Sequence, residues 1–231
     1  MDEAHTPVMK RKQLEIILED VAGFRSPKVW LEQYPTGAHL ASCMMYTASS
    51  MGDVRDKCVI DLGCGTGVLS VAAALMGAEH CLAIDIDDEA LEVAMENAEQ
   101  FDGGLNIDYI QGDVRRASGF SNRFLPDTVV MNPPFGTKNV GADREFLDSA
   151  FSLFQHSSDI PSIRSHGVIY SLHKSSTRKF IEKHVRTHGC NMCRVIAEMR
   201  YDLPRSYKFH KKDSVDIAVD FWYVSTRKLA V

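Results

Sequence analysis

The chain has 231 residues, of which 45% are hydrophobic, and a formal net charge of -5. A chain of this length and composition can bury one core large enough to fold alone. No apolar stretch reaches the roughly 18 residues that a membrane span needs, and the N-terminus lacks the apolar core of a signal peptide. We therefore expect a soluble intracellular protein without membrane contact.

The six cysteines fall mostly within predicted strands and helices. This placement is typical of reduced, buried thiols, and it favours the nucleus and cytoplasm as compartments. Cys190 and Cys193 form a C-x-x-C pair, but no second such pair completes a metal site with them. We therefore predict that this chain binds no metal.

Three helices are predicted at the N-terminus, over residues 12–20, 27–34 and 38–49. We expect them to form a helical extension, residues 1–50, which packs on a catalytic domain of residues 51–231. Beyond it, strands are predicted near 58–62, 80–86, 107–111, 128–132, 167–172, 194–200 and 215–224, and helices near 67–76, 88–101, 143–154 and 175–188. This alternation predicts an α/β fold with a doubly wound, mainly parallel sheet of seven strands. The last strand follows its predecessor without a helix, so we expect it to be antiparallel.

The first of these strands leads into a glycine-rich turn. Residues 58–67 read CVIDLGCGTG, and an apolar helical pattern follows up to Gly77. Glycines let the backbone approach a ligand closely, and the start of the helix offers unpaired N–H groups. The G-x-G-x-G spacing is shared with dinucleotide-binding proteins, so it is a moderately specific signal. Asp61 lies inside the segment and could orient the loop rather than bind a ligand.

Acidic residues follow the next two strands. Asp85 ends the second strand, about 20 residues beyond the glycines, where an acid can accept hydrogen bonds from both hydroxyls of a ribose. Asp113 follows the third strand and is placed to accept from an adenine amino group. Since parallel strands end at one edge of the sheet, these acids predict a nucleoside-shaped crevice. The glycine spacing is not G-x-G-x-x-G and no P-loop is present, which argues against a nicotinamide cofactor.

The most informative motif is Asn132-Pro133-Pro134-Phe135, at the end of the fourth strand. Each proline fixes its own φ and restricts the residue before it, so the Asn132 side chain and the Pro133 carbonyl are held rigidly. Both groups can accept hydrogen bonds, and Phe135 offers a stacking face. The motif predicts a catalytic pocket for a planar NH2 group. Taken alone, Asn-Pro is also a common opener of surface turns.

Charge is distributed unevenly along the chain. Residues 85–113 contain ten acidic residues and no Lys or Arg, whereas residues 174–186 and 200–212 each hold five bases against one acid. A polyanion would be steered to the basic half. Aromatic residues alternate with bases in RSYKFHKK (205–212), as a stacking surface for nucleic acid requires. We predict that RNA contacts Lys174, Arg205, Lys208, Lys211 and Lys212. A solvated helix face is a credible alternative for residues 174–186 and a weaker one for residues 205–212.

The loop of residues 136–143, GTKNVGAD, follows the Asn-Pro-Pro-Phe motif. Its glycines, asparagine and charges are typical of a mobile lid over a substrate, and an ordinary connecting loop is the equal alternative.

Five sequence blocks resemble the methyltransferase-like protein 5 family: LEQYPT (31–36), DLGCGTG (61–67), NPPFGTKN (132–139), YSLHKSST (170–177) and RYDLPRSYKFHKK (200–212). The resemblance implies a class I Rossmann-like methyltransferase that uses S-adenosylmethionine to methylate N6 of one adenosine in small-subunit (18S) ribosomal RNA. It also implies an obligate heterodimer with a small zinc-binding methyltransferase activator. The cofactor contacts that it implies are Gln33, Thr36, Gly63, Thr66, Val68, Asp85, Asp113 and Val114.

Other activities share parts of this pattern. Protein glutamine N5-methyltransferases and guanine N2 methyltransferases use an N-P-P-aromatic pocket for the same amino-group problem. Phe rather than Tyr at position 135 and the basic segment 205–212 favour nucleic acid. A catalytically silent RNA-binding assembly factor is the third alternative, and the intact motif set argues against it.

The strand at residues 107–111 is expected to lie at an edge of the sheet. This follows from the strand order 3-2-1-4-5-7-6, which is typical of the fold that the chain resembles. An apolar edge strand is prone to aggregation unless another chain covers it. We therefore expect the activator to pair with the strand Ile107–Gln111.

Overall fold

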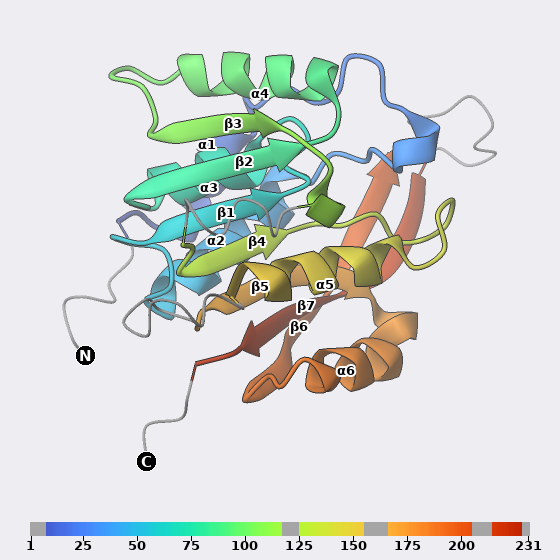
Figure 1. Cartoon of the computed structure of the whole chain (residues 1–231). Helices are drawn as coiled ribbons and strands as arrows, with labels where there is room; N and C mark the ends of the chain where they lie inside the picture. The colour runs from blue at the N-terminus through green and yellow to red at the C-terminus, as the bar shows by residue number, and fades with distance from the viewer. Residues whose placement is uncertain (1–7, 117–124, 155–165, 205–213, 228–231) are drawn as a thin grey trace.

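We describe the computed structural model over residues 8–116, 125–154, 166–204 and 214–227. Its centre is a seven-stranded sheet in the order β3-β2-β1-β4-β5-β7-β6 (Figure 1). The strands are β1 (Cys58–Leu62), β2 (His80–Asp85), β3 (Ile107–Gln111), β4 (Thr128–Met131), β5 (Val168–Lys174), β6 (Met192–Pro204) and β7 (Ser214–Ser225). Strands β1 to β5 pair in parallel, and β7 pairs antiparallel with both β5 and β6. The predicted strand order and the antiparallel last strand are confirmed.

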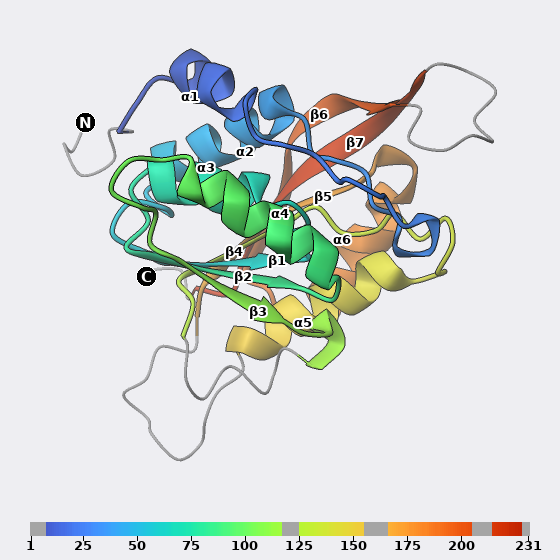
Figure 2. The same cartoon turned by 90° about the horizontal axis from the view of Figure 1, so that it is seen from above.

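Helices cover both faces of the sheet. They are α1 (Arg11–Leu18), α2 (Ala38–Ser50), α3 (Val68–Leu75), α4 (Asp88–Glu99), α5 (Ala142–Phe154) and α6 (Arg178–Thr187), with short 3-10 helices η2 (Val29–Leu31) and η4 (Ser175–Thr177). Figure 2 shows α1 to α4 on one face and α5 with α6 on the other. Among the described residues, no helix has both the length and the apolar character that crossing a membrane requires.

Two large hydrophobic clusters, with a third small one of Cys64, Ala83 and Leu91, pack between the sheet and the helices. Successive strand residues point to opposite faces, so Val59 packs in the cluster with α1 to α3 while Ile60 packs in the cluster with α5 and α6. Val130 and Val129 of β4 divide in the same way. Burial on both faces explains the continuous apolar runs of the central strands.

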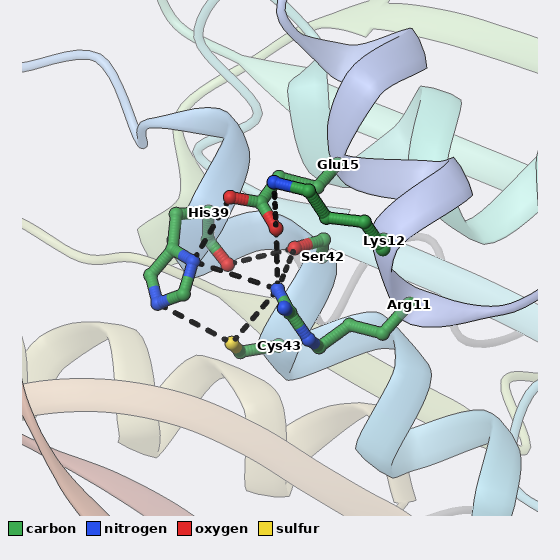
Figure 3. Close-up of polar contacts among 6 residues, drawn as sticks. All are labelled: Arg11, Lys12, Glu15, His39, Ser42 and Cys43. Atoms are coloured by element: carbon green, nitrogen blue, oxygen red, sulfur yellow. Dashed lines mark hydrogen bonds and ion pairs between the residues drawn. The ribbon is translucent and has the colours of Figure 1, made fainter.

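The N-terminal helices share the first of these clusters. Leu14 of α1 is fully buried. A polar group around Arg11 fastens α1 to α2 at the surface (Figure 3): its guanidinium donates to Glu15 at 2.6 Å and to the Ser42 hydroxyl at 3.4 Å, and His39 lies 3.1 Å from Glu15. Both helices therefore pack as part of one core with the sheet.

The predicted second helix, residues 27–34, is wrong. Only the 3-10 turn Val29–Leu31 forms there. Glu32 ends it with φ 53°, in the left-handed region, and Pro35 disfavours a helical Tyr34. After that turn the chain continues without helix across the carboxyl ends of the strands (Figure 1), and residues 30–36 line a cavity there.

Candidate functional site

A cavity of about 360 Å³ lies at the carboxyl ends of β1, β2 and β4, within the usual range for small-molecule sites. Its lining combines the N-terminal segment of residues 30–36, the glycine turn and the loop after β4. Nine of the residues predicted from sequence line it: Gln33, Thr36, Gly63, Thr66, Asp85, Asp113, Val114, Asn132 and Pro134. Val68, Pro133 and Phe135 are not part of the lining; Val68 is buried in the first turn of α3.

The glycine turn has the backbone that its sequence predicts. Gly63, Gly65 and Gly67 all have positive φ, at 69°, 54° and 83°. A side chain at Gly63 would also meet Phe146 at 2.6 Å, and one at Gly65 would meet Phe24 at 2.7 Å. These contacts explain why the wall of the cavity is bare backbone at this point.

Asp61 belongs to the scaffold under this turn. Its carboxylate accepts a 2.6 Å hydrogen bond from the Ser70 hydroxyl of α3, and it does not line the cavity. Burial raises the pKa of Asp61 to about 7. The structure therefore favours the alternative in which Asp61 orients the glycine turn.

Asp85 is held by the backbone on both of its oxygens. Oδ2 accepts from the Gly65 N–H at 2.8 Å, and Oδ1 accepts from the Asp87 N–H at 2.9 Å. The residue is 8% exposed, and burial raises its pKa. Because a carboxylate offers about four lone-pair sites, the fixed group retains acceptor capacity toward the cavity.

Lys28 and Asp87 form an ion pair that the sequence analysis did not predict. The Lys28 ammonium lies 2.5 Å from Asp87, which also accepts from the Gln33 amide at 2.6 Å. Burial would raise the pKa of Asp87, but these two partners lower it. Gln33 thus fastens the N-terminal segment to the start of α4, and no local signal links residues so distant in sequence.

Glu32 fastens the same segment to the loop after β4. Its buried carboxylate accepts from the Thr137 hydroxyl at 2.7 Å and from the Lys138 N–H at 2.8 Å. The Asn139 amide donates to the Trp30 carbonyl at 2.8 Å. These contacts give residues 137–139 fixed partners in the wall of the site; the mobility of the loop stays a prediction.

Asp113 lies at the edge of the cavity, and its carboxylate is engaged by Arg115. Two guanidinium nitrogens donate to it at 2.6 to 3.0 Å, and this pairing lowers its pKa. The positive charge of Arg115 therefore offsets the negative charge of Asp113 at this edge of the cavity. Arg115 also lines the cavity, and the sequence analysis did not predict it.

Asn132 has one satisfied and one unsatisfied side-chain atom. Its amide nitrogen donates to the Thr36 hydroxyl at 2.8 Å and to the Tyr201 hydroxyl at 3.2 Å. Tyr201 in turn donates to the Pro35 carbonyl at 3.1 Å, so its oxygen serves Asn132 as an acceptor. The buried Asn132 Oδ1 has no partner among the described residues. The two hydroxyls thereby fix which way the amide faces.

Tyr201 also positions the aromatic residue of the motif. Its ring lies edge-on to Phe135, with centroids 5.6 Å apart, and the Lys174 ammonium sits 5.9 Å from the Phe135 centroid. Burial raises the pKa of Tyr201 to about 12, so the hydroxyl keeps its proton. Arg205, Lys208, Lys211 and Lys212 lie outside the described residues. Chemically, the site offers a fixed, unpaired oxygen acceptor beside an aromatic ring.

Known proteins are similar to this chain in sequence and in fold. A model of the ribosomal protein L11 methyltransferase family (PrmA) matches residues 33–132. The chain is 50% identical to the rRNA N6-adenosine-methyltransferase METTL5 of Danio rerio, over 92% of this chain and 97% of the relative. It is 42% identical to the rRNA N6-adenosine-methyltransferase Mettl5 of Drosophila melanogaster, over 93% and 95%. A crystal structure from Pyrococcus horikoshii, described as a candidate RNA methyltransferase, matches with a TM-score of 0.77 and 37% identity, over 94% and 98%.

Proposed function

Because this chain belongs to the METTL5 family of rRNA N6-adenosine-methyltransferases, we propose that it methylates N6 of one adenosine in 18S rRNA, within a heterodimer with a small zinc-binding activator. It is an S-adenosylmethionine-dependent enzyme of the Rossmann-like fold. The observation that supports the target group is the buried Asn132 Oδ1, an acceptor held without a partner. Nucleus and cytoplasm are the proposed compartments, since ribosomal RNA is found in both.

The residues around the cavity fit the cofactor. Bare backbone at Gly63 and Gly65 allows close approach, and Asp85 presents fixed acceptors suited to the ribose hydroxyls. When bound, S-adenosylmethionine supplies an electrophilic methyl group on a sulfonium. Thr36, Thr66 and Val114 are proposed to complete the contacts from the cavity wall, whereas Val68 would act from the first turn of α3.

The proposed mechanism follows from the chemistry of the adenine amino group. The N6 lone pair is delocalised into the ring, so N6 is a weak nucleophile. Asn132 Oδ1 and the Pro133 carbonyl accept both N–H bonds of a flipped-out adenine, and Phe135 stacks on its ring. These contacts favour tetrahedral geometry at N6, which makes its lone pair available to attack the methyl group. No strong base is needed, because the N6 proton becomes acidic after transfer.

Identification of the product tests this function. The protein with its activator is incubated with methyl-labelled S-adenosylmethionine and, in parallel reactions, with small-subunit rRNA or a peptide-release factor. The labelled nucleoside or amino acid is then identified by mass spectrometry. Label in N6-methyladenosine supports the proposal. Label in N2-methylguanosine, or only in glutamine of a release-factor substrate, would replace it with one of the two rival activities.

Removing the Asp85 carboxylate is expected to weaken cofactor binding. Asp85→Ala should lose about 1–3 kcal/mol, or roughly 5- to 150-fold in Kd, the range for hydrogen bonds to a charged group. Calorimetry with S-adenosylmethionine measures the change. Asp88→Ala, an exposed acid at the start of α4, serves as control. Equal affinity of Asp85→Ala and the control would refute the placement.

Tyr201 is proposed as a positioning residue for Asn132. Tyr201→Phe keeps the ring against Phe135 but removes the hydroxyl that fixes the amide. Turnover should fall by about 3- to 10-fold, the effect of one hydrogen bond, with cofactor affinity unchanged. Tyr223→Phe, another buried tyrosine of the sheet, should leave turnover as in the wild type. A loss of cofactor affinity matching the loss of turnover would indicate a merely structural role.

RNA binding is proposed for the basic segment 205–212 together with Lys174 at the end of β5. Each lysine–phosphate contact contributes about 0.7–0.9 to the slope of log affinity against log salt. Neutralising Lys211 and Lys212 should therefore reduce this slope by roughly 1.5. Filter binding at several salt concentrations measures it, and an unchanged slope would leave these residues as a solvated turn.

A further inference from the structure

Three potential metal ligands converge between α5 and α6, away from the cavity. Asp148 Oδ1 of α5 lies 2.6 Å from His184 Nε2 and 2.8 Å from His188 Nε2, both from α6 and its C-terminal cap. The three ligand atoms lie within 4.8 Å of one another. The two helices lie side by side on one face of the sheet (Figure 1). The group thus joins two elements that the sequence separates.

Aromatic stacking orients both imidazoles. Phe151 of α5 stacks on His188 with centroids 4.4 Å apart and planes 4° from parallel. Phe180 lies parallel to the His184 ring at 6.2 Å. The imidazole edges are therefore directed at one point by packing as well as by the carboxylate. Preset ligands lose less freedom on binding an ion than free surface side chains do.

We propose that Asp148, His184 and His188 bind a divalent transition-metal ion, with Zn²⁺ as the best match. Two imidazole nitrogens and one carboxylate oxygen are a ligand set that Zn²⁺ accepts, with water in the fourth position. Each neutral imidazole then carries its single proton on Nδ1 and offers the Nε2 lone pair. The negative end of the α6 dipole, at His188, also favours a cation.

The site needs little adjustment to hold the ion. With metal–ligand bonds of about 2.0–2.2 Å, ligand atoms in a tetrahedral site lie about 3.3 Å apart. The two nitrogen–oxygen distances must therefore open by about 0.5–0.7 Å, and the two imidazole nitrogens, which lie within 4.8 Å of each other, must reach the same spacing. Side-chain exposures of 45% for Asp148, 16% for His184 and 23% for His188 leave the groups that freedom.

An ion here would cross-link α5 to α6 without entering the reaction. None of its three ligands lines the cavity. A metal ion at this position differs from the expectation that this chain binds no metal. That expectation considered the cysteines, whereas the His184-x-x-x-His188 pair acquires its third ligand only when α5 packs beside α6.

Titration of the full chain with ZnCl2, followed by calorimetry and thermal unfolding, tests the site. The matched variants are Asp148→Asn and His188→Gln. His80→Gln is the control, because the His80 ring pairs with Asp108 at 3.0 Å and belongs to no group of three potential metal ligands among the described residues. Any zinc held by a co-purified activator is present equally in the wild type and in every variant, so it does not change the difference in zinc content between them. At a hundredfold excess of free Zn²⁺ over Kd, the wild-type Tm should rise by about 5–10 °C.

The proposal predicts one Zn²⁺ equivalent more in the wild type and His80→Gln than in the Asp148 and His188 variants. Co²⁺ bound there should show no thiolate-to-metal charge-transfer band. Absence of this extra equivalent, or its equal presence in all variants, would overturn the site. So would its loss on replacing Cys190 and Cys193 by serine, because the ion would then belong to the thiols.

Discussion

Replacing Asn132 by alanine is expected to lower methyl transfer to rRNA by several hundredfold while cofactor affinity stays nearly unchanged. The change removes Oδ1, a buried acceptor of a cavity-lining residue that has no partner within the described part of the chain. Loss of a single preorganised group that acts on the reacting centre typically lowers turnover by about 10²–10³. Cofactor affinity should persist because Asp85 and the glycine turn keep their own hydrogen bonds. Single-turnover rates and calorimetry measure the two quantities separately.

Asn106→Ala is the matched control for this prediction. Asn106 lies just before β3, at the end of that strand opposite the cavity, and its side chain donates to the Glu79 carbonyl. Turnover of the control should equal that of the wild type. If Asn132→Ala also kept full turnover, the assignment of the catalytic motif would fail.

Placing proline at Gln111 is expected to abolish the proposed complex with the activator. β3 is an edge of the sheet, and in the described part of the chain it pairs only with β2. The Cys81 N–H donates to the Asn106 carbonyl and the Gly112 N–H to the Asp85 carbonyl. By the alternation of a parallel ladder, residues 106, 108, 110 and 112 face β2, so the Gln111 N–H points to the outer edge. Proline removes that donor.

Gln111→Ala is the control, because it removes the exposed side chain and keeps the N–H. Co-purification with the activator should be normal for alanine and lost for proline, and the lone proline variant should be poorly soluble. Recovery of the complex with Gln111→Pro at wild-type yield would locate the interface elsewhere. Ile110→Pro would not be a clean test, because its N–H faces β2 and its loss disrupts the sheet itself.

The strand order was predictable because the sequence blocks resemble a family whose fold has that order, whereas local patterns predicted the individual strands and their parallel pairing. Each central strand is a short apolar run followed by a turn and a helix, and parallel connections of this kind have few allowed topologies. The carboxyl ends of β1, β2 and β4 then had to meet, which placed Gly63, Asp85 and Asn132 together. Proximity of these motifs therefore follows from sequence patterns within about 10 residues of each.

The residues that hold the cavity-lining residues in place could not be predicted from local patterns. Tyr201 reaches Asn132 from β6, 69 positions away, and Glu32 reaches the loop after β4 across 106 positions. In the sequence, the buried Glu32 cannot be distinguished from a surface glutamate. Its partners are mostly backbone N–H groups, and nearly every residue type carries such a group. The predicted helix over 27–34 failed for a related reason, because long-range contacts of Lys28, Glu32 and Gln33 stabilise a different conformation of this segment.

A crystal structure with a bisubstrate analogue, in which adenosine N6 is joined to the methyl-donor position of the cofactor, tests the central claim most directly. The claim is that Asn132 Oδ1 binds the amino group that receives the methyl. We expect N6 about 3 Å from Asn132 Oδ1 and within hydrogen-bond reach of the Pro133 carbonyl. We also expect Phe135 against the adenine and the ribose of the donor half on Asp85. An adenine bound elsewhere, with Asn132 Oδ1 still unpaired, would contradict the account.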